Sequence, residues 1–277
     1  MNKLLNKNKI LKTKPFFSII TVVKNDENNI KKTIKSVIQQ SFKNYEYIII
    51  DGKSSDQTLA QIKKYKKKIN ILISQRDKGI YYAMNKGLNF SNGEVIVFIN
   101  SGDLFTKNAL KIVYNKFREN KKIDFVFGTV LRHYTKASIL KSGFNINKLI
   151  YNFDFATAHS TGFFLKKKIY TLLKGFNTKY MCSADYNIYY KICFKHNLKG
   201  ASTLKNQLIG IVASGGFSSK VSFFGHLKEE VQIRFDNKQN IFFIIIIFLN
   251  TLIKYFYINL IRWTYKNKNN YELHIKN

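Results

Sequence analysis

Three aspartates in this chain each come shortly after a short apolar segment. Asp51 closes YIIID, Asp77 follows ILISQR, and Asp103 follows VIVFINSG. If the apolar segments are parallel strands, their carboxyl ends lie along one edge of a sheet, where α/β proteins bind their ligands. The pattern therefore predicts that three carboxylates far apart in sequence meet at one binding site.

Four segments have the composition of strands that are covered on both faces, because they are nearly continuous in apolar, β-branched and aromatic residues. Helical patterns separate them, and Asn25 or Asp26 is placed to cap the first helix. This alternation predicts an α/β fold with a Rossmann-like, mostly parallel sheet and right-handed crossovers. The predicted strands are residues 16–23, 45–50, 69–73 and 95–99, and a helix is expected at about 108–117.

Each of these aspartates also has a local explanation, because an Asp after a strand often caps a helix or a turn. Asp56, in SSDQT, is assigned to capping. The chain lacks both GxGxxG and GxxxxGK[ST], so a phosphate ligand would need a metal or basic side chains. Asp103 lies in the turn NSGD and suits a hard cation such as Mg²⁺ or Mn²⁺, and Gly102 beside it adds no side chain to obstruct a ligand.

Six motifs follow one another along residues 16–220. The first three are SIITVVKNDENNIKKTIKSVIQQSFKNYEYIIIDGKSSDQT, RDKGIYYAMNKG and GEVIVFINSGDLF, and the last three are TAHSTGFF, CSADYNIYYKIC and SGGFSS. In this order the chain resembles the family 2 glycosyltransferases, which have the GT-A fold, and the last three motifs resemble the family's histidine, acceptor-side aspartate and glycine-rich segments. The bacterial enzymes that build colanic acid, O-antigen and other surface polysaccharides are the most similar group.

The resemblance implies a nucleotide-sugar site in the first half of the chain. Asp51 would contact the nucleobase, and the DKGIYYAMNKG stretch would close over the donor. Asp103 corresponds to the last aspartate of a DXD-like metal motif. Ser101 stands where the family has another aspartate, so one anionic ligand is missing. The donor-binding residues implied are Thr21, Val23, Asp51, Gly52, Asp77, Lys78, Asn85, Ser101, Gly102 and Asp103.

Asp185, in SADYN, corresponds to the general base that takes a proton from the acceptor hydroxyl in an inverting transfer. Its alternative role is to cap the helix that starts near Tyr186. His159 has three open roles: ligand to the divalent metal, Mn²⁺ or Mg²⁺, contact with the diphosphate or acceptor, or an ordinary hydrogen-bonded histidine. Ser214, Gly215 and Gly216 form either a loop over the donor or a simple turn.

The formal net charge of +31 in 277 residues calls for an anionic partner or surface. Nucleic acid would fit that charge, but the aromatic residues sit in apolar runs and no nucleic-acid-binding motif is present. We therefore expect no nucleic acid as partner. Two alternatives stay open. One is a sugar nucleotidyltransferase, although such enzymes normally have a glycine-rich loop after the first strand and the segment TVVKNDENNI has no glycine. The other is a non-catalytic sugar-nucleotide-binding relative.

The end of the chain favours a membrane surface. Residues 241–261, IFFIIIIFLNTLIKYFYINLI, are long enough to cross a bilayer, but Lys254 and two asparagines make crossing costly. A helix lying in the interface is favoured over a spanning helix and over packing against the domain. With no signal peptide recognised and Cys182 and Cys193 expected as free thiols, we expect a cytoplasmic protein peripheral to the inner face of the membrane.

The expected organisation has four parts. A basic tail, 1–15, precedes a nucleotide-sugar-binding half, 16–120, and an acceptor-binding half, 121–235, which starts with a strand at 124–130 and shares one sheet with the first half. An amphipathic, membrane-associated segment, 236–277, completes the chain. The expected partners are a nucleotide-sugar donor, a saccharide or lipid-linked acceptor and an anionic membrane surface, and the sequence carries no signal of oligomeric state.

Overall fold

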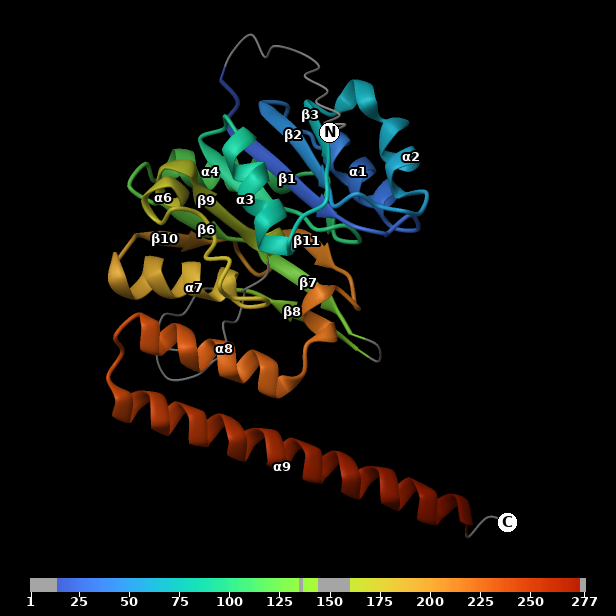
Figure 1. Ribbon diagram of the computed structural model, residues 1–277, viewed down its shortest axis with the longest axis vertical. Helices are drawn as coiled ribbons and strands as arrows, with labels where there is room; N and C mark the ends of the chain where they lie inside the picture. The colour runs from blue at the N-terminus through green and yellow to red at the C-terminus, as the bar shows by residue number, and fades with distance from the viewer. Residues whose placement is uncertain (1–13, 135–136, 144–159, 275–277) are drawn as a thin grey trace.

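The computed structural model describes residues 14–134, 137–143 and 160–274, and it contains two sheets (Figure 1). The larger sheet has seven strands in the order β10-β6-β9-β4-β1-β2-β3, and the smaller has four in the order β5-β11-β7-β8. Helices cover both faces of the larger sheet, and the long final helix lies below it in this view.

Parallel strands form the first half of the larger sheet. β1 (Phe17–Val23) lies between β2 (Tyr45–Asp51) and β4 (Val95–Phe98), and β3 (Ile71–Ser74) pairs with the far side of β2. All three pairings are parallel, so these strands end at the same edge. The four predicted strands are confirmed, each overlapping the strand that forms.

The larger sheet continues past residue 120, as expected. β9 (Phe163–Lys166) is antiparallel and joins β4 to β6 (Phe125–Phe127), and β10 (Gly200–Ser202) pairs with β6 at the edge. One mostly parallel sheet therefore contains strands from both halves of the chain. This confirms the predicted α/β class with a Rossmann-like sheet.

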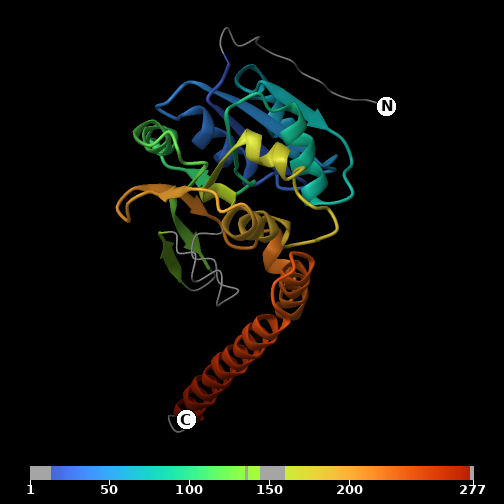
Figure 2. The same cartoon turned by 90° about the vertical axis from the view of Figure 1, so that its left-hand side faces the viewer.

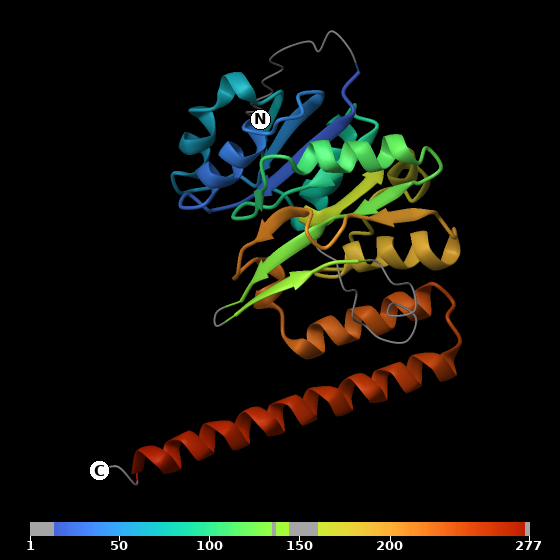
Figure 3. The ribbon, with the colours of Figure 1, turned by 180° about the vertical axis from the view of Figure 1, so that it is seen from behind.

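The single strand expected at 124–130 is wrong, because the chain passes from one sheet to the other at Gly128. β6 ends before this residue, and β7 (Thr129–His133) belongs to the smaller sheet. A Cβ on Gly128 would lie 2.6 Å from Cγ1 of Ile209, so only glycine allows β11 to pack this closely. The smaller sheet, visible from behind in Figure 3, is completed by β5 (Leu104–Phe105), β8 (Ser138–Lys141) and β11 (Leu208–Val212).

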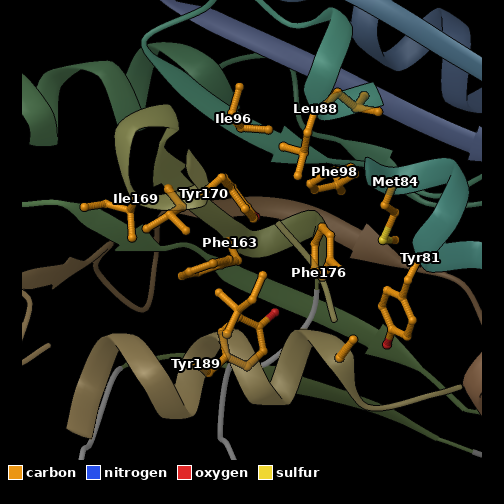
Figure 4. Close-up of a cluster of buried hydrophobic side chains, with 14 of the residues drawn as sticks. Tyr81, Met84, Leu88, Ile96, Phe98, Phe163, Ile169, Tyr170, Phe176 and Tyr189 are labelled. Atoms are coloured by element: carbon orange, nitrogen blue, oxygen red, sulfur yellow. The ribbon is translucent and has the colours of Figure 1, made fainter. Parts of the chain in front are cut away.

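Alternate residues of the central strands enter two separate hydrophobic cores. Ile20 and Val22 of β1 face one core, and Phe17, Ile19 and Val23 face the other. This explains why the strand sequences are apolar throughout rather than alternating. The first core, shown in Figure 4, is covered by α3 (Ile80–Phe90), α6 (Lys167–Leu172) and α7 (Ala184–Tyr190), and the second by α1 (Ile30–Ile38), α2 (Thr58–Lys63) and α4 (Ala109–Glu119).

The expected cap of the first helix is also wrong. Asn29 occupies the N-cap of α1 and makes no side-chain capping bond. Asn25 instead has a positive φ of 52°, and its Oδ1 accepts a hydrogen bond from the backbone N–H of Ser55 at 2.9 Å. Asn25 therefore ties the loop after β1 to the loop after β2. The shorter helical turns are η1 (Lys66–Lys68), η2 (Ser160–Gly162), the π-helical η3 (Lys191–Lys195) and η4 (Phe217–Lys220).

Two helices complete the described chain. α8 (Phe223–Asp236) packs on α7, and α9 (Ile241–His274) runs back along α8 (Figure 1). Figure 2 shows α9 extending from the body of the molecule as a rod. Ile244 and Ile247 are buried, and the ring of Tyr255 stacks on that of Phe223 with centroids 3.9 Å apart. The α8–α9 pair is therefore a packed unit at one side of the domain.

Candidate active site

Asp51 is a fully buried carboxylate at the end of β2. Oδ1 accepts from Ser54 Oγ at 2.5 Å, and Oδ2 accepts from Ser74 Oγ at 2.6 Å and from the backbone N–H of Ser54 at 3.2 Å. These bonds compensate for the lost hydration of the carboxylate. Asp51 therefore holds together the ends of β2 and β3.

The other predicted residues of the β1–β2 edge lie beside Asp51. Val23 is the register partner of Asp51, and its carbonyl accepts from Gly52 N–H at 2.8 Å. Thr21 is buried, and its hydroxyl lies 3.0 Å from that of Tyr47. Thr21 is fully buried inside β1, so its contact with a donor stays a prediction.

Asp103 is buried in the turn after β4. Its Oδ2 accepts from Thr161 Oγ1 at 2.6 Å, and its Oδ1 accepts from the backbone N–H of Ala213 at 2.9 Å. Gly102 has a φ of +96°, which favours glycine, and its N–H donates to Thr33 Oγ1 at 2.9 Å. Asp103 thus brings together three segments: its own turn, η2 (Ser160–Gly162) just before β9, and the chain after β11, which continues into Ser214–Gly216.

Asp51 ends β2, and Asp103 lies in the turn between β4 and β5. β2 and β4 are the two parallel neighbours of β1, so their ends are two strand spacings apart, about 10 Å. Both aspartates therefore follow strands that end at the same edge of the sheet.

Asp185 lies in the first turn of α7, beside the first core, and is half-buried. Tyr81, from the first turn of α3, donates its hydroxyl to Asp185 Oδ1 at 3.1 Å, and Figure 4 shows its side chain extending toward α7. Burial and the charge of Asp185 raise the pKa of Tyr81 well above its ordinary value of 10.0. The tyrosine therefore stays protonated and donates to the carboxylate at neutral pH.

Ser160 connects Asp185 to the turn of Asp103. Its Oγ accepts from Asn100 Nδ2 at 3.1 Å, and Ser160 lines the same narrow pocket as Asp185. The next residue, Thr161, bonds to Asp103. Asp103 and Asp185 therefore lie on segments that meet at Ser160–Thr161. Asp51 lies at the end of β2, on the other side of β1 from β4.

The remaining predicted donor residues surround the start of α3. Asp77 Oδ1 forms a 2.7 Å ion pair with Lys86, while Oδ2 is buried without a hydrogen-bond partner among the described residues. Lys78 is exposed. The Asn85 amide donates to the carbonyl of Phe176 and accepts from its N–H, both at 2.8 Å. Asn85 thus fixes the loop before α7, and its side chain is not free for a ligand.

The turn of Asp103 has the chemistry of a hard-cation site. The Asn100 Oδ1 and Ser101 Oγ atoms are buried and lack hydrogen-bond partners within the described ranges. Together with the Asp103 carboxylate they form an oxygen-only donor set, which Mg²⁺ and Mn²⁺ prefer. No group of three or more His, Cys, Asp or Glu gathers as metal ligands among residues 14–134, 137–143 and 160–274. His159 lies outside the described residues.

Sequence reasoning missed several residues that shape this site. Tyr81 lies in the motif RDKGIYYAMNKG, and Ser160 and Thr161 lie in TAHSTGFF. Their roles depend on partners 58 to 104 residues away, which no local pattern reveals. Cys182 and Cys193 are free and buried, as expected.

Comparison with known proteins identifies the class. Residues 18–192 match the model of glycosyl transferase family 2. The UDP-Glc:alpha-D-GlcNAc-diphosphoundecaprenol beta-1,3-glucosyltransferase WfgD of Escherichia coli is 31% identical over 112 residues, which cover 40% of this chain and 44% of WfgD. The S. aureus TarS 1–349 structure in complex with UDP-GlcNAc superposes with a TM-score of 0.65 at 19% identity, over 81% of this chain and 68% of TarS 1–349. The mannosyltransferase PcManGT from Pyrobaculum calidifontis, solved with GDP-Man and Mn²⁺, gives a TM-score of 0.61 at 15% identity, over 83% and 66%.

The fold and the family match place the chain among the glycosyltransferases of the GT-A fold. The chain belongs to glycosyl transferase family 2, because the family match covers residues 18–192 of 277. This confirms the resemblance and the enzyme class predicted from the sequence. The alignment spans less than half of the length of WfgD, so donor, acceptor and linkage need an argument from this chain's own residues.

Proposed function

We propose that this protein transfers a sugar, with inversion, from a nucleoside-diphosphate sugar to a hydroxyl of a saccharide acceptor. The acceptor is carried on a membrane lipid, and the product enters a bacterial surface polysaccharide. The observation that supports this most is the connection of Asp103 and Asp185 through the Ser160–Thr161 segment. Asp51 ends β2, which runs parallel to β1 and β4 and ends at the same edge of the sheet. This arrangement offers a donor edge and an acceptor-side carboxylate on neighbouring segments.

The donor would lie along the ends of β1, β2 and β4. The backbone at Thr21–Val23, with Asp51 and Gly52, would receive the nucleoside, and the turn from Ser101 to Asp103 would face the diphosphate. Asp77 Oδ2 is a buried acceptor without a hydrogen-bond partner in the described part of the chain. A sugar hydroxyl donating to it would compensate for its lost hydration.

A divalent cation, Mn²⁺ or Mg²⁺, fits the turn of Asp103. Asp103, Asn100 Oδ1 and Ser101 Oγ would hold it, and the donor diphosphate would supply further oxygens. When bound, the cation would neutralise charge on the departing diphosphate. PcManGT was solved with Mn²⁺ and GDP-Man, which supports the proposal.

Asp185 would act as the general base. The acceptor oxygen attacks the anomeric carbon, the bond to the diphosphate breaks, and the acceptor proton passes to Asp185. Tyr81 donates to Oδ1 at 3.1 Å and would orient the carboxylate toward the acceptor. The single displacement places acceptor and diphosphate on opposite faces of the sugar, so the configuration inverts.

The helix α9 would hold the enzyme at an anionic membrane surface on the cytoplasmic side. Its residues Ile241–Ile261 have a mean hydropathy of 2.2 over their most apolar window, and only 11% of that window is buried. Phe242, Ile246 and Ile253 are 72%, 61% and 67% exposed. Because α9 packs along α8, with Tyr255 stacked on Phe223, we place it in the interface rather than across the bilayer. The WfgD acceptor, a diphosphoundecaprenol lipid by its name, supports a membrane-borne acceptor here.

Titration calorimetry with UDP-glucose, UDP-N-acetylglucosamine, GDP-mannose and dTDP-glucose tests the donor site. UDP-sugars are expected to bind, about tenfold more tightly with Mn²⁺ than with EDTA. Asp103→Asn should bind UDP-sugars no more tightly with Mn²⁺ than with EDTA. Asp124→Asn, which removes a carboxylate paired with Lys166 and Lys168, is the control, and its affinity for UDP-sugars should rise with Mn²⁺ as in the wild type. If none of the four donors binds in either condition, the proposal is wrong.

A further inference from the structure

Glu229, on α8, places its carboxylate on the backbone just ahead of α7. Oε1 accepts from the N–H of Met181 at 2.6 Å. Oε2 accepts from the N–H of Cys182 and of Ser183, both at 2.9 Å, and lies 3.2 Å from Cys182 Sγ. One side chain thus binds three successive backbone donors, although it is 46 to 48 residues away in sequence.

The loop that Glu229 binds has no comparable local support. Ser183 is the N-cap residue of α7, and its side chain makes no capping hydrogen bond. Burial raises the pKa of the Cys182 thiol to about 12, so the thiol is protonated and can donate to Glu229. Hydrogen bonds to an ionised acceptor are stronger than bonds between neutral groups. The carboxylate therefore fixes the direction in which the chain enters α7.

α8 also holds the flanks of this loop. Asp236 Oδ2 accepts from the Tyr180 hydroxyl at 2.6 Å, and Asn237 Nδ2 donates to Asn187 Oδ1 at 3.0 Å. α8 and its C-cap residue, Asn237, therefore contact the chain before α7 and in the first turn of α7. Asp185, the proposed base, lies two residues after Ser183 inside this clamped stretch.

We propose that Glu229 is a positioning residue for Asp185: its carboxylate holds residues 181–183 so that the Asp185 side chain meets the acceptor hydroxyl. The inference rests on the proposed role of Asp185 as base. Glu229 itself contacts no reacting atom. Its carboxylate binds residues 181–183, just ahead of α7, and not the strand ends of the proposed donor edge, so it acts on the transfer step and leaves donor binding unchanged.

The test compares the full-length wild type with Glu229→Gln, Glu229→Asp and Glu119→Gln. The amide keeps one acceptor oxygen but turns an NH₂ group toward backbone N–H donors, whereas Asp keeps the charge on a shorter side chain. Glu119 is an exposed residue of α4 and serves as the matched control. The rate of UDP release from a UDP-sugar is measured with a synthetic N-acetylglucosamine diphosphate on an alkyl chain as acceptor, and UDP binding is measured by calorimetry.

We expect kcat to fall about tenfold in Glu229→Gln and less in Glu229→Asp, with the Kd for UDP and the donor KM within about twofold of wild type. Glu119→Gln should match wild type. An unchanged kcat in a folded Glu229→Gln, or a parallel loss of kcat and UDP affinity, overturns the inference. If Glu229→Gln does not fold, Glu229→Asp decides by the same two criteria.

Asp185→Asn, measured in parallel, separates this inference from the proposed function. If Asp185→Asn retains full activity, the assignment of the base is wrong, and the positioning role fails with it. If Asp185→Asn is inactive while Glu229→Gln is fully active, only the positioning role is wrong.

Discussion

The Tyr81 hydroxyl donates a hydrogen bond to Asp185 Oδ1 at 3.1 Å, although the two residues are 104 positions apart. Tyr81 follows the Asp77–Gly79 segment that the family resemblance assigns to the donor, and Asp185 belongs to the acceptor side. The pair therefore joins the two halves of the proposed site. Burial keeps the phenol protonated, so the bond persists at the pH of an ordinary assay.

Tyr81→Phe removes this hydrogen bond and keeps the ring, which stacks on Phe176 at a centroid distance of 5.4 Å. A hydrogen bond to a charged group contributes about 1.5–3 kcal/mol, and we expect part of this as a kcat about tenfold lower. The Kd for UDP should not change. Steady-state kinetics with calorimetry checks this, and Tyr82→Phe, at an exposed neighbour, is the control. A kcat equal to that of wild type would show that Tyr81 does not orient Asp185.

Asp51→Asn should weaken both stability and donor binding. Asp51 accepts from two hydroxyls and one backbone N–H, and an amide would turn its NH₂ group toward some of these donors. We expect a loss of about 1–3 kcal/mol in the free energy of unfolding and weaker binding of UDP. Urea unfolding and calorimetry measure the two quantities. Asp124→Asn, at the start of β6, should leave UDP binding intact, and equal effects from both variants would contradict the role of Asp51.

The strands were predictable because their signal is local. The four apolar segments predicted the parallel strands, and the aspartates that follow them led to the proposed donor edge. What sequence could not give depends on tertiary packing. Gly128 has the sequence context of a strand residue, and only its packing against Ile209 shows why the strand breaks there. Asn25 has the sequence context of a helix cap, but its side chain bonds to Ser55 in the loop after β2. Glu229 has no motif at all, because its partners are backbone N–H groups of another segment.

Acid should destabilise the fold partly through α8. Burial alone would raise the pKa of Glu229, but the backbone N–H groups of Cys182 and Met181 hold it below its ordinary value of 4.5. The hydrogen bond from Tyr180 lowers the pKa of Asp236 below 3.8. For both groups the folded-state pKa lies below the unfolded one, so their contribution is present above the unfolded pKa and is lost as pH falls through the folded pKa. The urea midpoint should therefore drop as pH is lowered below about 4.5, and less steeply in Asp236→Asn than in Glu119→Gln.

The apolar face of α9 should be necessary for membrane binding. Phe242, Ile246 and Ile253 share one exposed face of the helix, so replacing all three with Glu should not disturb the packing of α8 on α9. We expect at least about tenfold weaker sedimentation with phosphatidylglycerol vesicles and an unchanged melting temperature. Leu172→Glu with Leu204→Glu, at exposed positions elsewhere, is the control.

Two outcomes would contradict this placement of α9. If the triple variant binds vesicles as well as the wild type does, α9 is not the part of the protein that contacts the membrane. If the wild-type protein stays in the membrane after an alkaline carbonate wash, α9 spans the bilayer instead of lying in the interface.

The most direct test of the account is the rate of sugar transfer by Asp185→Asn, followed with a radiolabelled UDP-sugar and the synthetic diphosphate acceptor. Asparagine fills the same space but cannot accept the proton. Transfer should fall by about 10²–10⁴-fold, with UDP bound as tightly as by wild type. Transfer at the wild-type rate would mean that the carboxylate held by Tyr81 does not take the acceptor's proton.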